Sequence, residues 1–260
     1  MDKCSNDFGK EKIRGLKYGG YIMNPIVDLH MHVVPGIDDG SCSIEESLEL
    51  LKLSIRQGVT DVFCTSHSGC ITESAERYFE NLKSLKDAVA SSGINIRLHK
   101  GCEVLCSKET IDNVIYFLNS GIFSTLGESK YVLTELYPDI DLSEALFIID
   151  EFKKNGYIPI IAHMERVSSL ERTAVAALIQ NGALVQVNVQ SLVNEGNSLI
   201  KERSRQLLVD RHIHFIGSDG HQINYRSPDF VSGVNYILKN ADINYATGIL
   251  NKNAQDLINT

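Results

Sequence analysis

The stretch Ile26-Val27-Asp28-Leu29-His30-Met31-His32 is a short apolar run that ends in two histidines separated by one residue. Successive side chains of a β-strand point to opposite faces, so Asp28, His30 and His32 are predicted to share one face, with Leu29, Met31 and Val33 on the other. Two imidazoles side by side at a strand end can bind one metal ion, and Asp28 is placed to orient one of them from behind. The alternative is a strand with two incidental histidines.

The same pattern recurs along the chain: a short apolar run, a polar residue that can bind metal, and then an amphipathic stretch. The runs and the residues that follow them are 26–27 with His30 and His32, 61–65 with His67, 95–98 with Glu103, 131–133 with Glu135, 158–161 with His163, 183–187 with Asn188, and 213–216 with Asp219 and His221. Helical patterns lie between them at about residues 43–58, 73–91, 141–155, 170–181 and 198–210, the first opened by a capping box of Ser43 and Glu46.

Strands that alternate with helices predict an α/β protein with a parallel sheet. Seven such units fit a closed β/α barrel better than an open sheet. In a barrel of this kind the functional side chains gather at the C-terminal ends of the strands, which is where nearly all the listed His, Asp and Glu residues fall. That position favours a shared metal site over incidental histidines.

Composition narrows the class of protein. The formal net charge is -8, so a nucleic-acid backbone is an unfavourable partner. The longest apolar runs are far shorter than the ~20 residues of a membrane span, and the N-terminus lacks the apolar core of a signal peptide. A cytoplasmic location is therefore the default expectation. Residues 1–23 are predicted to be a disordered leader, or mis-assigned sequence before a true start at Met23, and 24–260 a single domain.

Other catalytic chemistries lack their motifs. The six cysteines form no Cys-x-x-Cys pair and are read as reduced thiols, mostly small core residues. The spacing from Cys70 to Arg77 is one residue too long for a Cys-x5-Arg phosphatase loop. Neither a G-x-S-x-G elbow nor a phosphate-binding glycine loop is present. A cysteine or serine nucleophile and a nucleotide-binding fold are disfavoured.

The candidate ligands mix nitrogen and oxygen donors without sulfur, which suits Mn²⁺, Fe or Zn²⁺. They are His30, His32, Asp39, His67, Glu103, Glu135, His163, Asp219 and His221, enough for two or three ions. Closely spaced ions activate water at neutral pH and stabilise an in-line displacement at phosphorus. The choice between Asp38 and Asp39 as the ligand is open. His99, His212 and His214 are left out of the site as ordinary polar residues.

Two arginines follow predicted ligands closely. Arg166 comes three residues after His163, and Arg226 comes five residues after His221. A guanidinium fork matches the oxygens of a phosphate group, whereas the alternative for each arginine is a surface salt bridge. Arg166, Arg226 and Asp39 are predicted to take part in catalysis, Asp39 also as a ligand, and the substrate is expected to be a phosphate ester.

These motifs together resemble the PHP superfamily of phosphoesterases, and most closely the bacterial tyrosine-protein phosphatases of capsule and exopolysaccharide operons, the CpsB/YwqE type. The resemblance covers about residue 24 to the C-terminus. Beyond the opening motif and Asp38-Asp39-Gly40, it rests on Gln57-Gly58-Val59-Thr60, Thr65-Ser66-His67, Gly101-Cys102-Glu103, Thr134-Glu135, Ile161-Ala162-His163-Met164-Glu165-Arg166, Gln186-Val187-Asn188 and Ser218-Asp219-Gly220-His221. One departure is Ser68-Gly69-Cys70, which replaces the basic or second-His continuation found in relatives.

The resemblance implies a distorted (β/α)7 TIM-like barrel, the PHP fold, with a site that usually holds manganese. It assigns His30, His32, Glu103 and Asp219 to one ion, Glu103, Glu135 and His163 to a second, and Asp39, His67 and His221 to a third. Arg166 and Arg226 would hold the phosphate. The implied substrate is phosphotyrosine on the tail of a bacterial tyrosine kinase that regulates polysaccharide export, and a homo-oligomer is possible.

Three other functions stay open on the sequence. A small-molecule PHP phosphoesterase, such as a histidinol phosphatase, shares the motifs. A non-catalytic metal-binding regulator could use the same scaffold, although the complete ligand set and both arginines argue against it. An amidohydrolase also opens with His-x-His in a barrel, but Glu103, Glu135 and the closing Asp-Gly-His fit that class less well.

Overall fold

The computed structural model describes residues 17–18, 21–22, 25–72 and 75–259. The predicted leader, residues 1–23, and the question of a start at Met23 lie mostly outside the described residues. Within that range only two short strands are described, β1 (Lys17–Tyr18) and β2 (Tyr21–Ile22), which pair in antiparallel fashion.

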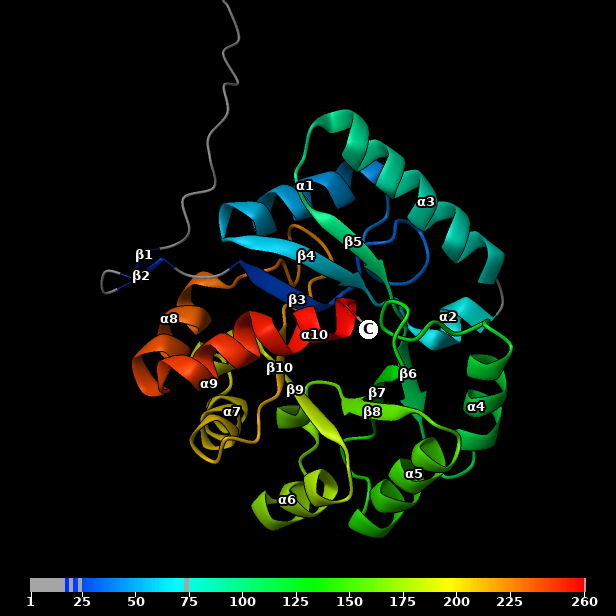
Figure 1. The fold of residues 1–260 in the computed structure, drawn as a ribbon, viewed down its shortest axis with the longest axis vertical. Coiled ribbons are helices and arrows are strands. Elements are labelled where there is room, and N and C mark those ends of the chain that lie inside the picture. Colours follow the sequence, from blue (N-terminus) through cyan, green and yellow to red (C-terminus); the bar gives the residue numbers. More distant parts are fainter. Residues whose placement is uncertain (1–16, 19–20, 23–24, 73–74, 260) are drawn as a thin grey trace, which may run out of the picture.

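Parallel strands form the centre of the fold (Figure 1). One sheet joins β3 (Ile26–Met31), β4 (Val59–Cys64) and β5 (Arg97–Lys100) in that order. A second sheet joins β6 (Glu103–Cys106), β7 (Tyr131–Leu136), β8 (Ile158–Ile161), β9 (Leu184–Asn188) and β10 (Phe215–Gly217). The sheets meet at both edges, because Met31 bridges Gly220 and His67 bridges Glu103 in parallel register. The strands therefore close into a barrel.

The distortion of the barrel lies at its third strand. The strand β4 pairs with β5 first, and the chain beyond it pairs through His67 with Glu103, the first residue of β6. Strands β5 and β6 are thus two halves of one position, interrupted at Gly101, where a Cβ would lie 2.9 Å from Thr65 Cγ2. Seven strand positions result, which confirms the predicted (β/α)7 barrel. Glu103 begins a new strand rather than simply following the third run.

Helices surround the strands (Figure 1). Five agree with the predicted ones within a few residues: α1 (Ile44–Arg56), α3 (Ala75–Ser92), α5 (Leu142–Lys154), α6 (Arg172–Gln180) and α7 (Ser198–Val209). Further helical segments were not predicted from the sequence: α2 (Ser68–Thr72), α4 (Ile111–Asn119), the 3-10 turns η1 (Met164–Arg166) and η2 (Val189–Val193), α8 (Val231–Asn240), α9 (Ile243–Thr247), the π-helix η3 (Gly248–Lys252) and α10 (Asn253–Ile258). None of the helices in the described part of the chain has the length and apolarity to cross a membrane.

Helix α1 begins at the predicted cap, Ser43, and the return bond of Glu46 goes to the residue before it. The Glu46 backbone N–H donates to Ser43 Oγ over 3.2 Å, and the Glu46 carboxylate accepts from the Cys42 backbone N–H over 2.9 Å. These bonds satisfy amide groups that have no partner within the helix. The polar first turn fixes where the chain leaves the loop that carries Asp38 and Asp39.

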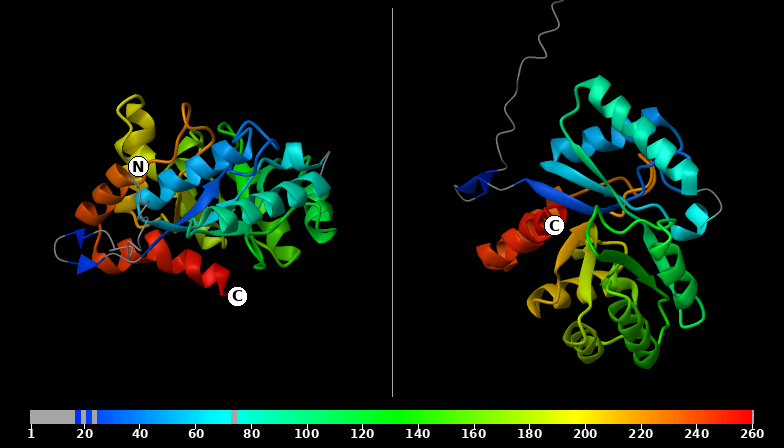
Figure 2. Two further views of the ribbon diagram at one scale, coloured as in Figure 1. Left: turned by 90° about the horizontal axis from the view of Figure 1, so that it is seen from above. Right: turned by 45° about the vertical axis from the view of Figure 1, so that its right-hand side comes forward.

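The core has two parts. A large cluster packs the helices against the outside of the barrel. A smaller cluster joins side chains of strands from opposite walls, among them Leu29, Phe63 and Ile160, with Ala254 and Leu257 of α10. Helix α10 therefore closes one end of the barrel, and Figure 2 shows it on the side opposite the loop after β10. The other end is left to the polar residues that follow the strands.

A cluster formed by a buried carboxylate and an exposed arginine ties β4 to β5. The Asp61 carboxylate is fully buried and accepts from Arg97 Nε over 2.6 Å and from Arg97 Nη2 over 2.7 Å. His99 Nε2 lies 2.9 Å from the same carboxylate, so His99 has a structural partner away from the predicted site. Burial alone would raise the pKa of Asp61, but the bonds from His99 and Arg97 outweigh it and hold the pKa well below its usual range.

We predict that Asp61→Asn lowers the free energy of unfolding by about 2 kcal/mol at pH 7, since it removes charge-assisted bonds from a buried acceptor. Because the pKa of Asp61 is lower in the folded protein, the stabilisation is present above the unfolded pKa of about 4 and is lost as the pH falls below it. Urea denaturation at pH 7 and at about pH 3 measures both effects.

The matched control is Asp87→Asn, which breaks an exposed pair with Lys83 on α3 and is expected to cost less than about 0.5 kcal/mol. An Asp61→Asn deficit of the same size at both pH values would contradict a role for the carboxylate charge.

Candidate metal centre

The end of β3 brings two imidazoles together. His30 Nε2 and His32 Nε2 lie 3.0 Å apart, and both residues are fully buried. The predicted alternation of the strand is only partly right, since Leu29 packs inside the barrel while Met31 and Val33 pack in the outer cluster. An irregularity in the pairing with β4 between Asp28 and Met31 accompanies this change. The two histidines nevertheless face one point at the open end of the barrel.

Asp28 does not orient an imidazole, so that prediction is wrong. Its Oδ1 accepts from the backbone N–H of Ser218 over 2.8 Å, and its Oδ2 accepts from Ser218 Oγ over 2.6 Å. Its bond to His30 goes to the backbone N–H over 3.2 Å and leaves the ring free. Burial raises the pKa of Asp28 to about 6, although the Ser218 bonds oppose that rise. Asp28 joins the first barrel strand to the last.

Other residues hold the two rings. Asp38 Oδ2 lies 2.8 Å from His32 Nδ1, and Gln186 Oε1 lies 3.3 Å from His30 Nδ1. Asp38 also accepts from the backbone N–H groups of Gly40 and His67. Asp38 thus supports His32 from behind, whereas its neighbour Asp39 faces His67 and His221, so Asp39 stays the candidate ligand of the two.

Glu103 lies at the centre of the cluster. Its Oε1 is 2.8 Å from His163 Nε2, and its Oε2 is 3.3 Å from His30 Nε2, 3.3 Å from His32 Nε2 and 3.0 Å from His67 Nδ1. This Oε2 is buried and accepts no hydrogen bond of acceptable geometry. A buried carboxylate oxygen without a donor, ringed by three imidazole nitrogens, fits a cation bound between them.

The electrostatics of the cluster also favour a cation. Burial alone would raise the pKa of Glu103, but the charge of His30 and the bond from His163 hold it well below the usual range. Burial alone would lower the pKa of His32, yet the bonds to Asp38 and Glu103 raise it to about 10. The carboxylates of Asp38 and Glu103 thus stabilise positive charge at His32, whereas burial and the charge of His32 lower the pKa of His221 to about 4.

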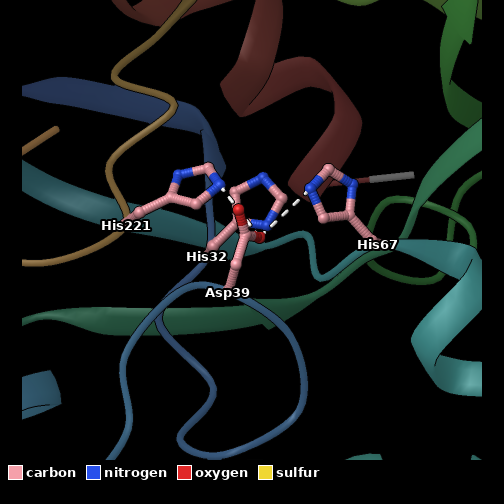
Figure 3. A group of neighbouring side chains, drawn as sticks. All are labelled: His32, Asp39, His67 and His221. Carbon is pink, nitrogen blue, oxygen red and sulfur yellow. Dashed lines mark ion pairs between the residues drawn. The ribbon is translucent and has the colours of Figure 1, made fainter. Parts of the chain in front are cut away.

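All nine predicted ligands come together. They form four overlapping groups whose ligand atoms lie within 4.8 Å of one another: His30, His32 and Asp219; His30, Glu103 and His163; His67, Glu103 and Glu135; and His32, Asp39, His67 and His221. Figure 3 shows the last group, in which Asp39 Oδ1 lies 3.4 Å from both His67 Nε2 and His221 Nε2. The grouping overlaps with the assignment to three ions that the resemblance implies. It differs in placing His32 with Asp39, in omitting Glu103 from the group of His30, His32 and Asp219, and in pairing Glu135 with His67. His163 Nε2 also lies 3.6 Å from Glu135.

Two of these residues have left-handed backbones. His163 follows β8 with a φ of 30°, and Asp219 follows β10 with a φ of 52°. For a non-glycine residue such a conformation costs of order 1–3 kcal/mol and concentrates at functional sites. The strained turns redirect both side chains toward the cluster immediately after their strands end.

Both predicted arginines reach the same carboxylate. Asp219 Oδ2 forms an ion pair with Arg166 Nη2 at 2.8 Å and accepts a hydrogen bond from Arg226 Nη2, while Arg226 Nη1 lies 3.2 Å from His221 Nε2. Their side chains are 41% and 31% exposed, so they lie at the rim of a cluster that is otherwise mostly buried. Asp219 Oδ1 faces His30 and His32 at 3.6 Å. One carboxylate thus links the guanidinium groups to the candidate ligands.

Residues outside the predicted site have structural contacts near it. His214 bonds to the backbone of β9, where Val185 N–H donates to its Nδ1. Asn188 was predicted as a metal-capable residue at the end of the sixth run, but it lies in none of the four ligand groups, and Gln186 was given no role; both lie buried directly behind the cluster. The signal for them was available, because polar residues two apart on an apolar strand share one face.

This fold and this set of donors are those of the metal-dependent hydrolase class, in which strand ends of a barrel surround closely spaced ions. Residues 26–259 match the model of the family described as "Capsular polysaccharide synthesis, CpsB/CapC". The chain therefore belongs to the CpsB/CapC family.

Relatives of known name agree with this membership. The chain is 27% identical over 242 residues to the tyrosine-protein phosphatase CpsB of Streptococcus agalactiae serotype III, covering 90% of this chain and 98% of the relative. It is 31% identical over 208 residues to the putative tyrosine-protein phosphatase CapC of Staphylococcus aureus, covering 77% and 79%.

A solved structure supports the fold. A chain from the crystal structures of YwqE from Bacillus subtilis and CpsB from Streptococcus pneumoniae, described as unique metal-dependent tyrosine phosphatases, matches with a TM-score of 0.78. It shares 24% of its sequence with this chain, and the match covers 90% of this chain and 94% of that one. The likeness in fold extends over nearly the whole of both chains.

We predict that Gly217→Ala lowers the free energy of unfolding by about 1–3 kcal/mol and weakens metal binding. A Cβ at Gly217 would lie 2.6 Å from His30 Cβ and 3.1 Å from Gln186 Nε2, so the ring of His30 must move. Urea denaturation and calorimetric titration of the metal-free protein with Mn²⁺ measure the two effects. Gly69→Ala is the control, since its Cβ meets no atom within 4 Å. Wild-type stability and affinity in Gly217→Ala would show that the strand tolerates the methyl group.

Proposed function

We propose that this protein is a metal-dependent phosphotyrosine-protein phosphatase. The observation that carries the proposal is the convergence of nitrogen and oxygen donors around Glu103, with Arg166 and Arg226 at their rim. Buried donors of this kind suit divalent ions, and exposed guanidinium groups beside them suit the oxygens of a phosphoryl group. Membership of the CpsB/CapC family supports the same activity.

The nine residues of the four groups are proposed as the ligands of two or three ions. Their donor set contains no sulfur, and we propose Mn²⁺ as the bound metal, with Fe or Zn²⁺ as alternatives. When bound, closely spaced divalent ions lower the pKa of water and stabilise negative charge on phosphoryl oxygens. Asp38 and Gln186 orient His32 and His30 so that each ring turns Nε2 toward the same point.

The arginines are proposed to bind the phosphoryl group of the substrate. In the structure both contact Asp219 Oδ2, an acceptor that already has a third donor in Asn188 Nδ2 at 2.9 Å. A phosphoryl group at the rim can therefore take over the guanidinium bonds without leaving Asp219 unsatisfied in the buried site. Asp39 is 65% exposed and reaches both the cluster and solvent, which places it beside an incoming substrate.

The substrate is proposed to be phosphotyrosine on the tail of a bacterial tyrosine kinase, whose dephosphorylation regulates capsular or exopolysaccharide synthesis. The support comes from the relatives in Streptococcus agalactiae and Staphylococcus aureus, both named as tyrosine-protein phosphatases, the second putatively. The family description refers to the same pathway of capsular polysaccharide synthesis.

We predict that Mn²⁺ supports hydrolysis of a phosphotyrosyl peptide and that EDTA abolishes it, with activity restored by added Mn²⁺. Alkylation of exposed cysteines such as Cys42 leaves the rate unchanged, since no cysteinyl intermediate is involved. Release of phosphate is the measurement. Full activity after verified removal of metal would overturn the mechanism.

The same assay separates the alternatives. Turnover of histidinol phosphate in preference to the peptide would indicate a small-molecule phosphoesterase. A protein that binds metal but hydrolyses neither compound would be a regulator.

We predict that Arg166→Met and Arg226→Met each lower kcat/KM for the peptide by roughly 10²–10³-fold, as expected for loss of one donor to transition-state charge. Metal content, measured by elemental analysis, should stay close to that of the wild type. Arg172→Met is the control, because Arg172 is exposed and pairs with Asp210 rather than with a candidate ligand. Wild-type kcat/KM in both rim variants would exclude the arginines from phosphate binding.

A further inference from the structure

Two amide side chains lie directly behind the candidate ligands. Gln186 and Asn188 lie two residues apart on β9, and both are almost completely buried. Gln186 Nε2 donates to Asn188 Oδ1 over 2.9 Å, and Asn188 Nδ2 donates to Asp219 Oδ2 over 2.9 Å. At the other end Gln186 Oε1 accepts from the backbone N–H of His163 over 2.8 Å and faces His30 Nδ1 at 3.3 Å. The two amides therefore connect three candidate ligands.

The orientation of each amide is determined from both ends. An ionised carboxylate only accepts, so Asp219 turns the NH₂ group of Asn188 toward itself and leaves Asn188 Oδ1 to face Gln186. Gln186 must then point its own NH₂ group at Asn188 and its Oε1 the other way. The backbone N–H of His163 only donates, so it requires the same orientation independently.

The orientation of Gln186 determines which ring nitrogen of His30 carries a proton. Gln186 Oε1 has no proton to give, so the contact is a hydrogen bond only when His30 Nδ1 carries one. In the neutral ring this leaves Nε2 with its lone pair facing His32 Nε2 and Glu103 Oε2. His32 Nδ1 likewise donates to the carboxylate of Asp38, whereas His30 depends on a neutral amide.

We infer that Gln186 and Asn188 are positioning residues that hold His30 with Nε2 as its metal-binding atom and fix Asp219 beside it. The inference rests on the proposed metal-dependent function and deepens it. His30 belongs to two of the four ligand groups, so a change in the orientation of its ring affects both groups. The residue behind a ligating histidine is expected to matter nearly as much as the ligand itself.

The backbone of this segment is anchored separately. Glu165 Oε1 accepts from the backbone N–H of Asn188 over 3.1 Å and from Ser191 Oγ over 2.6 Å. These bonds do not involve either amide side chain. Changes confined to the side chains of Gln186 and Asn188 therefore leave the anchoring of β9 to η1 in place.

The test is calorimetric titration of the metal-free protein with Mn²⁺, together with its thermal unfolding. Gln186→Met keeps the length of the side chain and removes its acceptor, and we expect Mn²⁺ affinity to fall about 10- to 100-fold. The matched control is Gln57→Met. Gln57 also bonds through both amide atoms, to the carbonyl of Pro228 and the N–H of Phe230, but contacts none of the ligands. It should lower the melting temperature and leave Mn²⁺ affinity unchanged.

Two further variants keep the inference falsifiable if Gln186→Met folds poorly. Gln186→Glu retains an acceptor for His30 Nδ1. It should bind Mn²⁺ at least about 10-fold more tightly than Gln186→Met, which is the smallest loss expected for Gln186→Met. Asn188→Leu breaks the same chain at its second link. The double variant Gln186→Met/Asn188→Leu should lose less affinity than the product of the two single losses, because both act on one chain.

The outcomes separate the inference from the function on which it rests. Wild-type Mn²⁺ affinity in Gln186→Met, with only a lower melting temperature, would show that the amide is structural and would overturn the inference alone. Independent, multiplicative losses in the double variant would also overturn it. Failure of the wild-type protein to bind Mn²⁺ would overturn the proposed metal site and the inference together.

Discussion

The rest of the structure depends on the junction between the first and last strands of the barrel. Asp28 and Ser218 are 190 residues apart in the chain and are joined by two hydrogen bonds through the buried carboxylate of Asp28. Next to them the backbone N–H of Asp219 donates to the carbonyl of His30 over 2.7 Å, and the N–H of His32 donates to the carbonyl of Gly220 over 2.9 Å. This closure places the histidines of β3 beside Asp219 and His221. Without it the ligands would lie at two separate edges of an open sheet.

Closure of the barrel also brings together ionisable side chains that would otherwise lie apart and titrate independently. Glu103, Asp219 and Asp38 are brought among five histidines in a space from which water is largely excluded. The raised pKa of His32, about 10, reflects its hydrogen bonds with Asp38 and Glu103, which outweigh the opposing effect of its burial. The left-handed backbones of His163 and Asp219 add strain at the same place. Such an arrangement is costly to the apoprotein and is favourable when a cation offsets the carboxylate charge.

The sequence allowed much of this arrangement to be predicted, and its failures have physical causes. The barrel and eight of the nine candidate ligands followed from apolar runs that end in polar residues, since parallel strands put their C-terminal ends at one rim, and Asp39 came from the loop after the first run. The role of Asp28 was predicted wrongly because strand alternation shows which face a residue shares but not which neighbour lies there. The break between β5 and β6 was missed because it depends on the close approach of Gly101 to Thr65. The helices after β10 were not identified in the sequence analysis, although α10 closes the barrel.

The sequence by itself determined the class of donor at each strand end, because residue type and the two-residue period of a strand are local properties. It also placed Arg166 and Arg226 in loops that follow ligands, for the same reason. Only the tertiary structure decided which atoms meet: Asp38 behind His32, Gln186 behind His30, and both arginines on one oxygen of Asp219. These pairings join residues far apart in the chain, and hydrogen-bond geometry within a few tenths of an ångström depends on how the whole barrel packs.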